Sequence, residues 1–130
     1  MSDFQTSLSI AASGMEAQAA RLRHVSENIA NVDTPGYHRK TIAFEAVVRD
    51  GEKSGEVRAG KVRLDQSELS RVLDPGNPLA DANGYYEGSN VDLVTEIADA
   101  REAQRSYEAN LRMFEQTRKM AASLLDLLRR

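Results

Sequence analysis

A regular spacing of apolar residues over residues 91–128 limits the possible folds of this chain more than any other feature. The positions advance by alternating steps of four and three residues, and all but Gln104 and Arg118 are apolar. Apolar residues at this spacing form one stripe along an α-helix, and no Gly or Pro follows Val91 to interrupt it. The sequence therefore predicts one helix of about 57 Å. Its stripe consists of Leu93, Ile97, Ala100, Gln104, Tyr107, Leu111, Phe114, Arg118, Ala121, Leu125 and Leu128.

Residues 4–31 carry a second stripe of the same kind. Its two rows repeat every seven residues, and Gln18 is their one polar member. This spacing lets one helix lie along another, and it predicts a helix of about 42 Å. The rows consist of Phe4, Leu8, Ala11, Met15, Gln18, Leu22, Val25 and Ile29. We expect both stripes to form the core of the chain.

The other faces of the first helix are rich in small side chains, which allow a neighbouring element to approach closely. Gly14 costs about 1 kcal/mol relative to Ala within a helix, which is reasonable where something packs tightly against it. A loosely exposed Ala-rich face explains the same residues equally well. The polar interruptions Gln18, Gln104 and Arg118 fix the helix register, face neighbouring subunits, or are simply exposed.

The middle of the chain has a different pattern. The stretches KTIAFEAVVRD and EVRAGKVRL contain β-branched residues partly in alternation and are separated by the turn-like GEKSG. Farther along, DPGNPLADANGYYEGSN combines two prolines and three glycines with an Asn83-Gly84 turn signal. We expect two to four short strands and then an irregular connector. The chain thus divides into an N-terminal helix in 1–34, a β-rich segment in 35–88 and a C-terminal helix in 89–130.

The stretch SENIANVDTPGYHRK predicts a joint between the first helix and the β-rich segment. Asn31 is suited to cap the helix in a left-handed conformation. Thr34 precedes a proline, which disfavours helical backbone, and Pro35-Gly36 suits the central pair of a type II turn. We therefore expect Asn31, Thr34, Pro35, Gly36 and Tyr37 to end the helix and redirect the chain.

The same stretch contains residue types found in catalytic loops, but their arrangement is uninformative. His24 and His38 are the two histidines of the chain, and neither has a metal-binding spacing with Asp33 or Glu27. Ser26, His24 and Asp33 are common residue types within ten positions, so they carry almost no evidence for a catalytic triad. We expect a protein that is not an enzyme and that uses no metal and no cofactor.

Composition argues against several classes of partner. The chain has 17 basic and 20 acidic residues, and the basic ones are scattered, so a nucleic-acid partner is not expected. It has no phosphate-binding glycine loop, and we expect no small-molecule substrate. No run approaches the roughly 20 apolar residues of a membrane span. The N-terminal stretch also lacks the pattern of a conventional cleavable signal peptide.

Both ends of the chain resemble the bacterial flagellar basal-body rod protein family. The block SGMEAQAARLRHVSENIANVDTPGYHRK is similar to the rod and hook signature built around N-I-A-N-x-x-T-P-G-Y. A second block runs from Asp74 to the leucine-rich C-terminal turn and includes RSYEAN at 105–110. The short length and the connector resemble the proximal rod members of the family. In one departure, Ser89 stands where the family usually has a proline, and a Ser or Asn there is suited to cap the last helix.

The resemblance implies a mainly α fold whose terminal helices pair as an antiparallel coiled-coil-like core domain. It implies a structural subunit of the proximal rod, the hollow drive shaft that transmits torque and passes exported subunits. Another rod or hook axial protein and a soluble coiled-coil adaptor are the alternatives. The residues expected in helix pairing and assembly are Phe4, Leu8, Ala11, Met15, Leu22, Val25, Ile29, Leu93, Ile97, Tyr107, Leu111, Phe114, Leu125 and Leu128.

The implied partners are copies of this chain, other rod proteins, and the ring and export-gate adaptor proteins of the basal body. The implied location is the rod where it crosses the periplasm, reached by export without a cleavable signal peptide. Direct insertion into a membrane is not expected.

Overall fold

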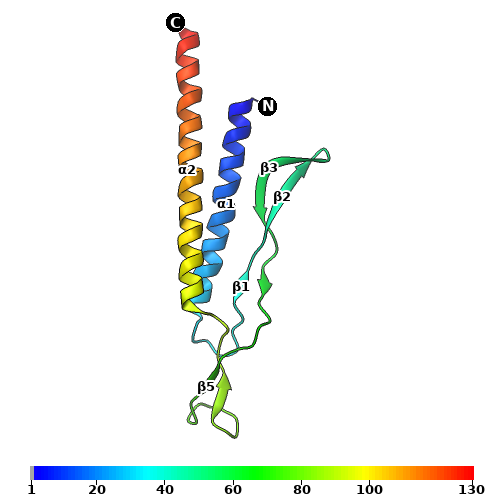
Figure 1. Cartoon of the computed structure of the whole chain (residues 1–130), viewed down its shortest axis with the longest axis vertical. Helices are drawn as coiled ribbons and strands as arrows, with labels where there is room; N and C mark the ends of the chain where they lie inside the picture. The colour runs from blue at the N-terminus through cyan, green and yellow to red at the C-terminus, as the bar shows by residue number, and fades with distance from the viewer. Residues whose placement is uncertain (1) are drawn as a thin grey trace.

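Two long helices organise the molecule. The computed structural model describes residues 2–130, so Met1, the first residue of the predicted segment 1–34, lies outside it. Helix α1 (Asp3–Ala30) and helix α2 (Leu93–Arg129) together contain half of the chain. They lie side by side and antiparallel, with both chain ends at the same end of an elongated molecule (Figure 1). The predicted long terminal helices and small β-rich middle are confirmed, whereas coiled-coil packing between the helices stays a prediction.

Side chains cap both helices at their N-termini. At α1, the Gln5 N–H donates to the Ser2 hydroxyl oxygen over 3.2 Å, and the Ser2 N–H donates to Gln5 Oε1 over 3.4 Å. These reciprocal bonds form a capping box. At α2, the Asp92 carboxylate accepts a hydrogen bond from the Val94 N–H over 3.0 Å. Both helices therefore start where a side chain satisfies an open backbone donor.

Helix α1 ends at Asn31, but not in the predicted conformation. Asn31 has φ −110° and ψ 16°, so the prediction of a left-handed cap is wrong. Its side-chain Nδ2 donates to the Glu27 carbonyl over 2.8 Å, and its backbone N–H reaches the carbonyls of Glu27 and Asn28. Because these bonds satisfy carbonyl groups that the last helical turn leaves open, the chain ends the helix without a left-handed residue.

The helix pair has a defined register. Gly14 of α1 faces Asn110 of α2, and farther along α1, Asn28 is hydrogen-bonded to Glu96 near the start of α2. Because α2 has nine residues more than α1, its C-terminal end extends past the start of α1 (Figure 1). Among residues 2–130, the last turns of α2 therefore have no partner helix.

The face of α2 that packs on α1 is rotated from the predicted stripe. Glu96 and Ala103 have no exposed surface, and Asn110 is partly buried against Gly14. These three positions repeat every seven residues and each directly precedes a position of the predicted stripe. Small and polar side chains in this row allow the two helices to approach closely, and the next row, Ile97, Gln104 and Leu111, turns outward.

The middle of the chain forms three separate two-stranded antiparallel ladders, so six short strands replace the two to four that were expected. Of the two additional strands, β6 lies in the connector that was predicted to be irregular, and β5 lies directly before it. The pairs are β1 (Lys40–Thr41) with β4 (Arg63–Leu64), β2 (Phe44–Arg49) with β3 (Glu52–Ala59), and β5 (Arg71–Leu73) with β6 (Tyr85–Glu87). The β5–β6 ladder forms a lobe beyond the joint end of the helices (Figure 1).

The β2–β3 hairpin turns one residue earlier than predicted. Asp50 and Gly51 have positive φ values of 52° and 80°, as a two-residue type I′ turn requires. Of the predicted turn GEKSG, the residues from Glu52 to Gly55 therefore lie in β3. Gly55 has φ 87° and lies where the strand register shifts, which marks a β-bulge.

Helix α1 lies between α2 and the β2–β3 hairpin (Figure 1). A Cβ atom at Gly55 would lie 2.9 Å from Ile10 Cδ1, and the Val57 N–H donates to the Ser13 hydroxyl oxygen over 3.1 Å. The small residues of α1 accommodate these two neighbours, so close packing explains the buried ones better than a loosely exposed face. They are Ala11, Ala17 and Ala20.

Candidate functional site

The predicted joint is a tight turn at the end of the helix pair. Gly36 has φ 74°, and the Tyr37 N–H donates to the Thr34 carbonyl over 3.2 Å, as expected for a type II turn centred on Pro35-Gly36. The Thr34 hydroxyl donates to Asn31 Oδ1 over 3.0 Å. The structure thus brings the five predicted joint residues together.

Asn28 connects the end of α1 to this turn. It is completely buried, and every hydrogen-bonding group of its side chain is used. Nδ2 donates to the Lys40 carbonyl over 2.9 Å and to Glu96 Oε2 over 3.3 Å. Oδ1 accepts from the Tyr37 hydroxyl and from the Lys40 N–H, each over 2.8 Å. Because a buried amide is stable only when it is bonded, Asn28 holds the joint and α2 in fixed positions.

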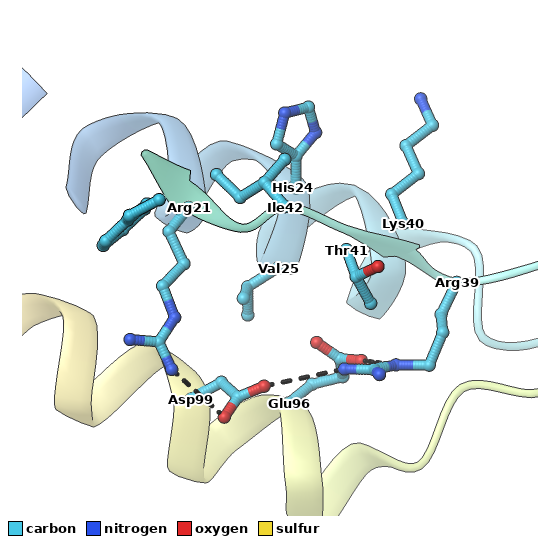
Figure 2. A pocket seen from close by; sticks show the side chains of 10 residues that line it. Arg21, His24, Val25, Arg39, Lys40, Thr41, Ile42, Glu96 and Asp99 are labelled. Carbon is cyan, nitrogen blue, oxygen red and sulfur yellow. Dashed lines mark hydrogen bonds and ion pairs between the residues drawn. The ribbon is translucent and has the colours of Figure 1, made fainter. Parts of the chain in front are cut away.

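Arg39 is the cation at the centre of the site. Its Nε donates to Glu96 Oε1 over 2.7 Å, and its terminal nitrogens lie 3.6 Å from Asp65 Oδ2 and 3.5 Å from Asp99 Oδ2. Arg21 reaches the other oxygen of Asp99 over 3.3 Å (Figure 2). Burial acts to lower the pKa of Arg39, but the hydrogen bond and the charge of Glu96 raise it above the ordinary value. Arg39 is therefore a permanent counter-ion for the fully buried Glu96.

A second ion pair closes the outer side of the joint. Lys40 Nζ lies 2.6 Å from Glu27 Oε2. This hydrogen bond lowers the pKa of Glu27 and raises the pKa of Lys40. Burial raises the pKa of Tyr37, so the Tyr37 hydroxyl keeps the proton that it donates to Asn28.

Asn90 and Ser89 attach the connector to the joint. Asn90 Oδ1 accepts from the Arg39 N–H over 2.6 Å, and its Nδ2 donates to the Asp65 carbonyl over 2.9 Å. The buried Ser89 hydroxyl donates to the Val32 carbonyl. The expectation that one of these two residues caps α2 is therefore wrong. Both side chains are occupied by the joint, and the helix begins only after them.

A cleft of about 290 Å³ opens beside the joint, between α1, β1 and α2 (Figure 2). Apolar Val25, Ile42 and Phe44 line it together with Arg39 and Glu96, which are already bonded to each other. Within residues 2–130, no three His, Cys, Asp or Glu residues are placed to hold a metal ion. None of the helices in that range has the length and apolar character of a membrane span. The hydrogen bonds and ion pairs of the site hold four chain segments rigidly together: the end of α1, the joint turn with β1, the stretch around Asp65, and the start of α2.

The residues predicted for helix pairing and assembly fall into two groups in the single chain. Those that are buried or partly buried are Phe4, Leu8, Ala11, Met15, Leu22, Val25, Tyr107 and Phe114. Those that are 36–75% exposed are Ile29, Leu93, Ile97, Leu111, Leu125 and Leu128. These six side chains therefore do not lie in the core of their own chain. For Ile97 and Leu111 the reason is that α2 turns the preceding row towards α1, and Leu125 and Leu128 belong to the turns of α2 at its free end. Contact of this group with another subunit stays a prediction.

Sequence reasoning missed four central residues of the site: Asn28, Arg39, Asn90 and Glu96. Asn28 and Arg39 lie inside the stretch that predicted the joint, but no role was assigned to them. The available signal was a polar residue beside an apolar stripe, since Asn28 directly precedes Ile29 and Glu96 directly precedes Ile97. Neighbouring polar positions of this kind on two paired helices are candidates for a buried polar contact.

Two family models match this chain. The model described as "Flagella basal body rod protein" matches residues 8–38, which include most of α1 and the joint turn. The model described as "Flagellar basal body rod FlgEFG protein C-terminal" matches residues 82–127, from the end of the connector through most of α2. The matched segments thus contain both sides of the joint.

Curated relatives agree with these matches. The chain is 46% identical over 127 residues to the flagellar basal-body rod protein FlgC of Agrobacterium fabrum, covering 92% of this chain and 91% of that protein. It is 36% identical over 124 residues to FlgC of Salmonella typhimurium, with 91% and 92% covered. It is 32% identical over 143 residues to FlgC of Bacillus subtilis, with 93% and 95% covered. The chain therefore belongs to the flagellar basal-body rod protein family, in its FlgC group.

Proposed function

We propose that this chain is a structural subunit of the flagellar basal-body rod. The relatives named as basal-body rod proteins match it along more than nine-tenths of its length. An elongated helix pair with a rigid joint suits a part that transmits force, because buried hydrogen-bonded networks resist deformation.

One observation carries the proposal: the end of α2 exposes apolar side chains that its own chain does not cover. Leu124, Leu125, Leu127 and Leu128 are 46–75% exposed and belong to the last two turns of α2. The end of that helix extends past the start of α1 (Figure 1). Fully burying one such side chain stabilises a protein by about 1.5–3 kcal/mol. An apolar patch of this kind at one end of a molecule is typical of an assembly surface.

The proposal also includes the packing, the partners and the location of the subunit. The terminal helices pack with those of other copies and of other rod proteins as a coiled-coil-like layer, and the assembled subunits form a hollow shaft that transmits torque and passes exported proteins. The chain contacts ring or export-gate adaptor proteins at one end of the rod and is located in the rod across the periplasm. Its role is mechanical, without catalysis.

A deletion strain tests the function. Removing the gene is expected to abolish swimming and to leave cells without filaments, and the intact gene on a plasmid is expected to restore both. Purified basal bodies from the complemented strain are expected to contain the chain, as detected by mass spectrometry. Normal swimming of the deletion strain would refute the proposal. Absence of the chain from basal bodies, despite loss of motility, would instead support the soluble adaptor.

A further inference from the structure

We infer that Arg39 and Glu96 couple two folding events: the docking of the first turns of α2 on α1, and the attachment of the β2–β3 hairpin at its base. This inference goes beyond the proposed rod function, because it concerns how the free subunit sets the position of its hairpin. The residues that carry it are Asn28, Arg39, Asp65 and Glu96.

The first half of the coupling is electrostatic. Glu96 has no exposed surface, and its two carboxylate oxygens bond to Arg39 and Asn28. Within residues 2–130, no cation other than Arg39 lies within 4.0 Å of it. A buried carboxylate that loses its cation is strongly destabilising. Helix α2 therefore brings Glu96 into the interface only when the joint has placed Arg39 there.

The second half concerns the base of the hairpin. The Arg39 carbonyl accepts a hydrogen bond from the Asp65 N–H over 2.9 Å, and the Arg39 guanidinium lies 3.6 Å from the Asp65 carboxylate. Residues 40–41 and 63–64 form the β1–β4 ladder directly between this contact and the hairpin. Arg39 thus holds both strands that lead into the hairpin, and it is itself held by α2.

The hairpin also has contacts that do not involve α2. Gly55 packs against Ile10, and the Val57 N–H bonds to the Ser13 hydroxyl, both on α1. If these contacts alone positioned the hairpin, a change at Arg39 would reach α2 through Glu96 and leave the hairpin base unaffected. The coupling predicts instead that a change at Arg39 reaches both α2 and the hairpin base, and that neutralising Glu96 removes the effect on α2.

The test is amide hydrogen exchange, resolved by residue with NMR, on the full chain. The Asp65 amide reports on the hairpin base, and the Ala100 amide, one turn after Glu96, reports on α2. Arg39→Gln is expected to raise the exchange rates of both amides at least tenfold. Adding Glu96→Gln is expected to return the Ala100 rate to within threefold of the wild type, because no unpaired charge remains buried.

Arg21→Gln is the matched control, since Arg21 also bridges α1 to the Asp99 carboxylate but has no fully buried partner. It is expected to change both rates less than threefold. The inference is overturned if Arg39→Gln affects only one of the two amides, if Glu96→Gln fails to restore Ala100, or if Arg21→Gln acts like Arg39→Gln. Should Arg39→Gln prevent folding, recovery of helical circular dichroism in the double variant supports the coupling, and an unfolded double variant overturns it. These outcomes do not test the proposed role in rod assembly, because the measurements use the free chain.

Discussion

Gly14 of α1 lies directly against the side chain of Asn110 of α2. A Cβ atom at residue 14 would be 2.7 Å from Asn110 Nδ2 and 2.8 Å from Oδ1. The same Nδ2 donates to the Ser106 carbonyl over 3.0 Å, which holds the Asn110 side chain along its own helix. The contact gives a physical reason for a glycine in the middle of α1, because only a residue without a side chain leaves this space open.

The first prediction concerns this contact. In an Asn110→Ala background, Gly14→Ala is expected to stabilise the chain by about 1 kcal/mol, because Ala favours the helix over Gly. In the wild-type background this gain is expected to be absent, because Asn110 must leave its bond to Ser106 to make room. Chemical denaturation of the four proteins measures the free energies of unfolding. An equal effect of Gly14→Ala in both backgrounds would contradict the contact.

The second prediction concerns the packing of the hairpin on α1. Gly55→Ala is expected to destabilise the chain more than Gly51→Ala. Both glycines have positive φ, which costs an alanine about 1–2 kcal/mol, but an added methyl group at residue 55 also meets Ile10, whereas nothing lies within 4 Å at residue 51. Urea denaturation curves of the two variants give the comparison. If the two variants lose equal stability, the hairpin does not pack on Ile10 as described.

The third prediction is a loss of order in the connector in acid. The N–H groups of Tyr85 and Asn83 donate to Asp81 Oδ1 over 3.0 Å and 2.9 Å. The hydrogen bond from Tyr85 is the main cause that lowers the pKa of Asp81. Because the folded pKa lies below the unfolded one, this stabilisation is present above the unfolded pKa and disappears as the pH falls through the folded pKa.

Amide exchange at Tyr85, followed as the pH is lowered, measures this effect. Protection is expected to decrease in the acidic range in the wild type. In Asp81→Asn, which keeps the shape but does not titrate, the pH-dependent part of the change is expected to disappear. A Tyr85 amide whose protection varies with pH equally in both proteins would show that Asp81 is not the group that titrates.

The fourth prediction separates assembly from folding. Replacing Leu125 and Leu128 by Ser is expected to change the free energy of unfolding of the isolated chain by less than about 0.5 kcal/mol, because both side chains are largely exposed. The same variant is expected to abolish swimming when it replaces the wild-type chain. Met113→Ser is the control, since Met113 is 66% exposed on α2 but lies within the part paired with α1. Normal swimming of the double Leu variant would argue against the assembly surface.

Local features of the chain were predictable without coordinates. The two helices begin and end within about two residues of the predicted bounds, because apolar spacing and the absence of Pro act within a few helical turns. The turn at Pro35-Gly36 was predictable for the same reason, since proline and glycine restrict or free their own backbone angles. The family resemblance rests on these same local stretches, and the comparisons with known proteins confirmed it.

Contacts between segments that are distant in the sequence could not be predicted and were determined only from the tertiary structure. The sequence around Glu96 makes it only a candidate for a buried polar contact. Whether this carboxylate or Ile97 faces α1 depends on Asn28 and Arg39, more than fifty residues away. The pairing of β5 with β6 across a long connector is of the same kind. A pattern reports which face of one element is apolar, whereas the partner of that face, and the polar groups buried beside it, depend on how all the elements pack together.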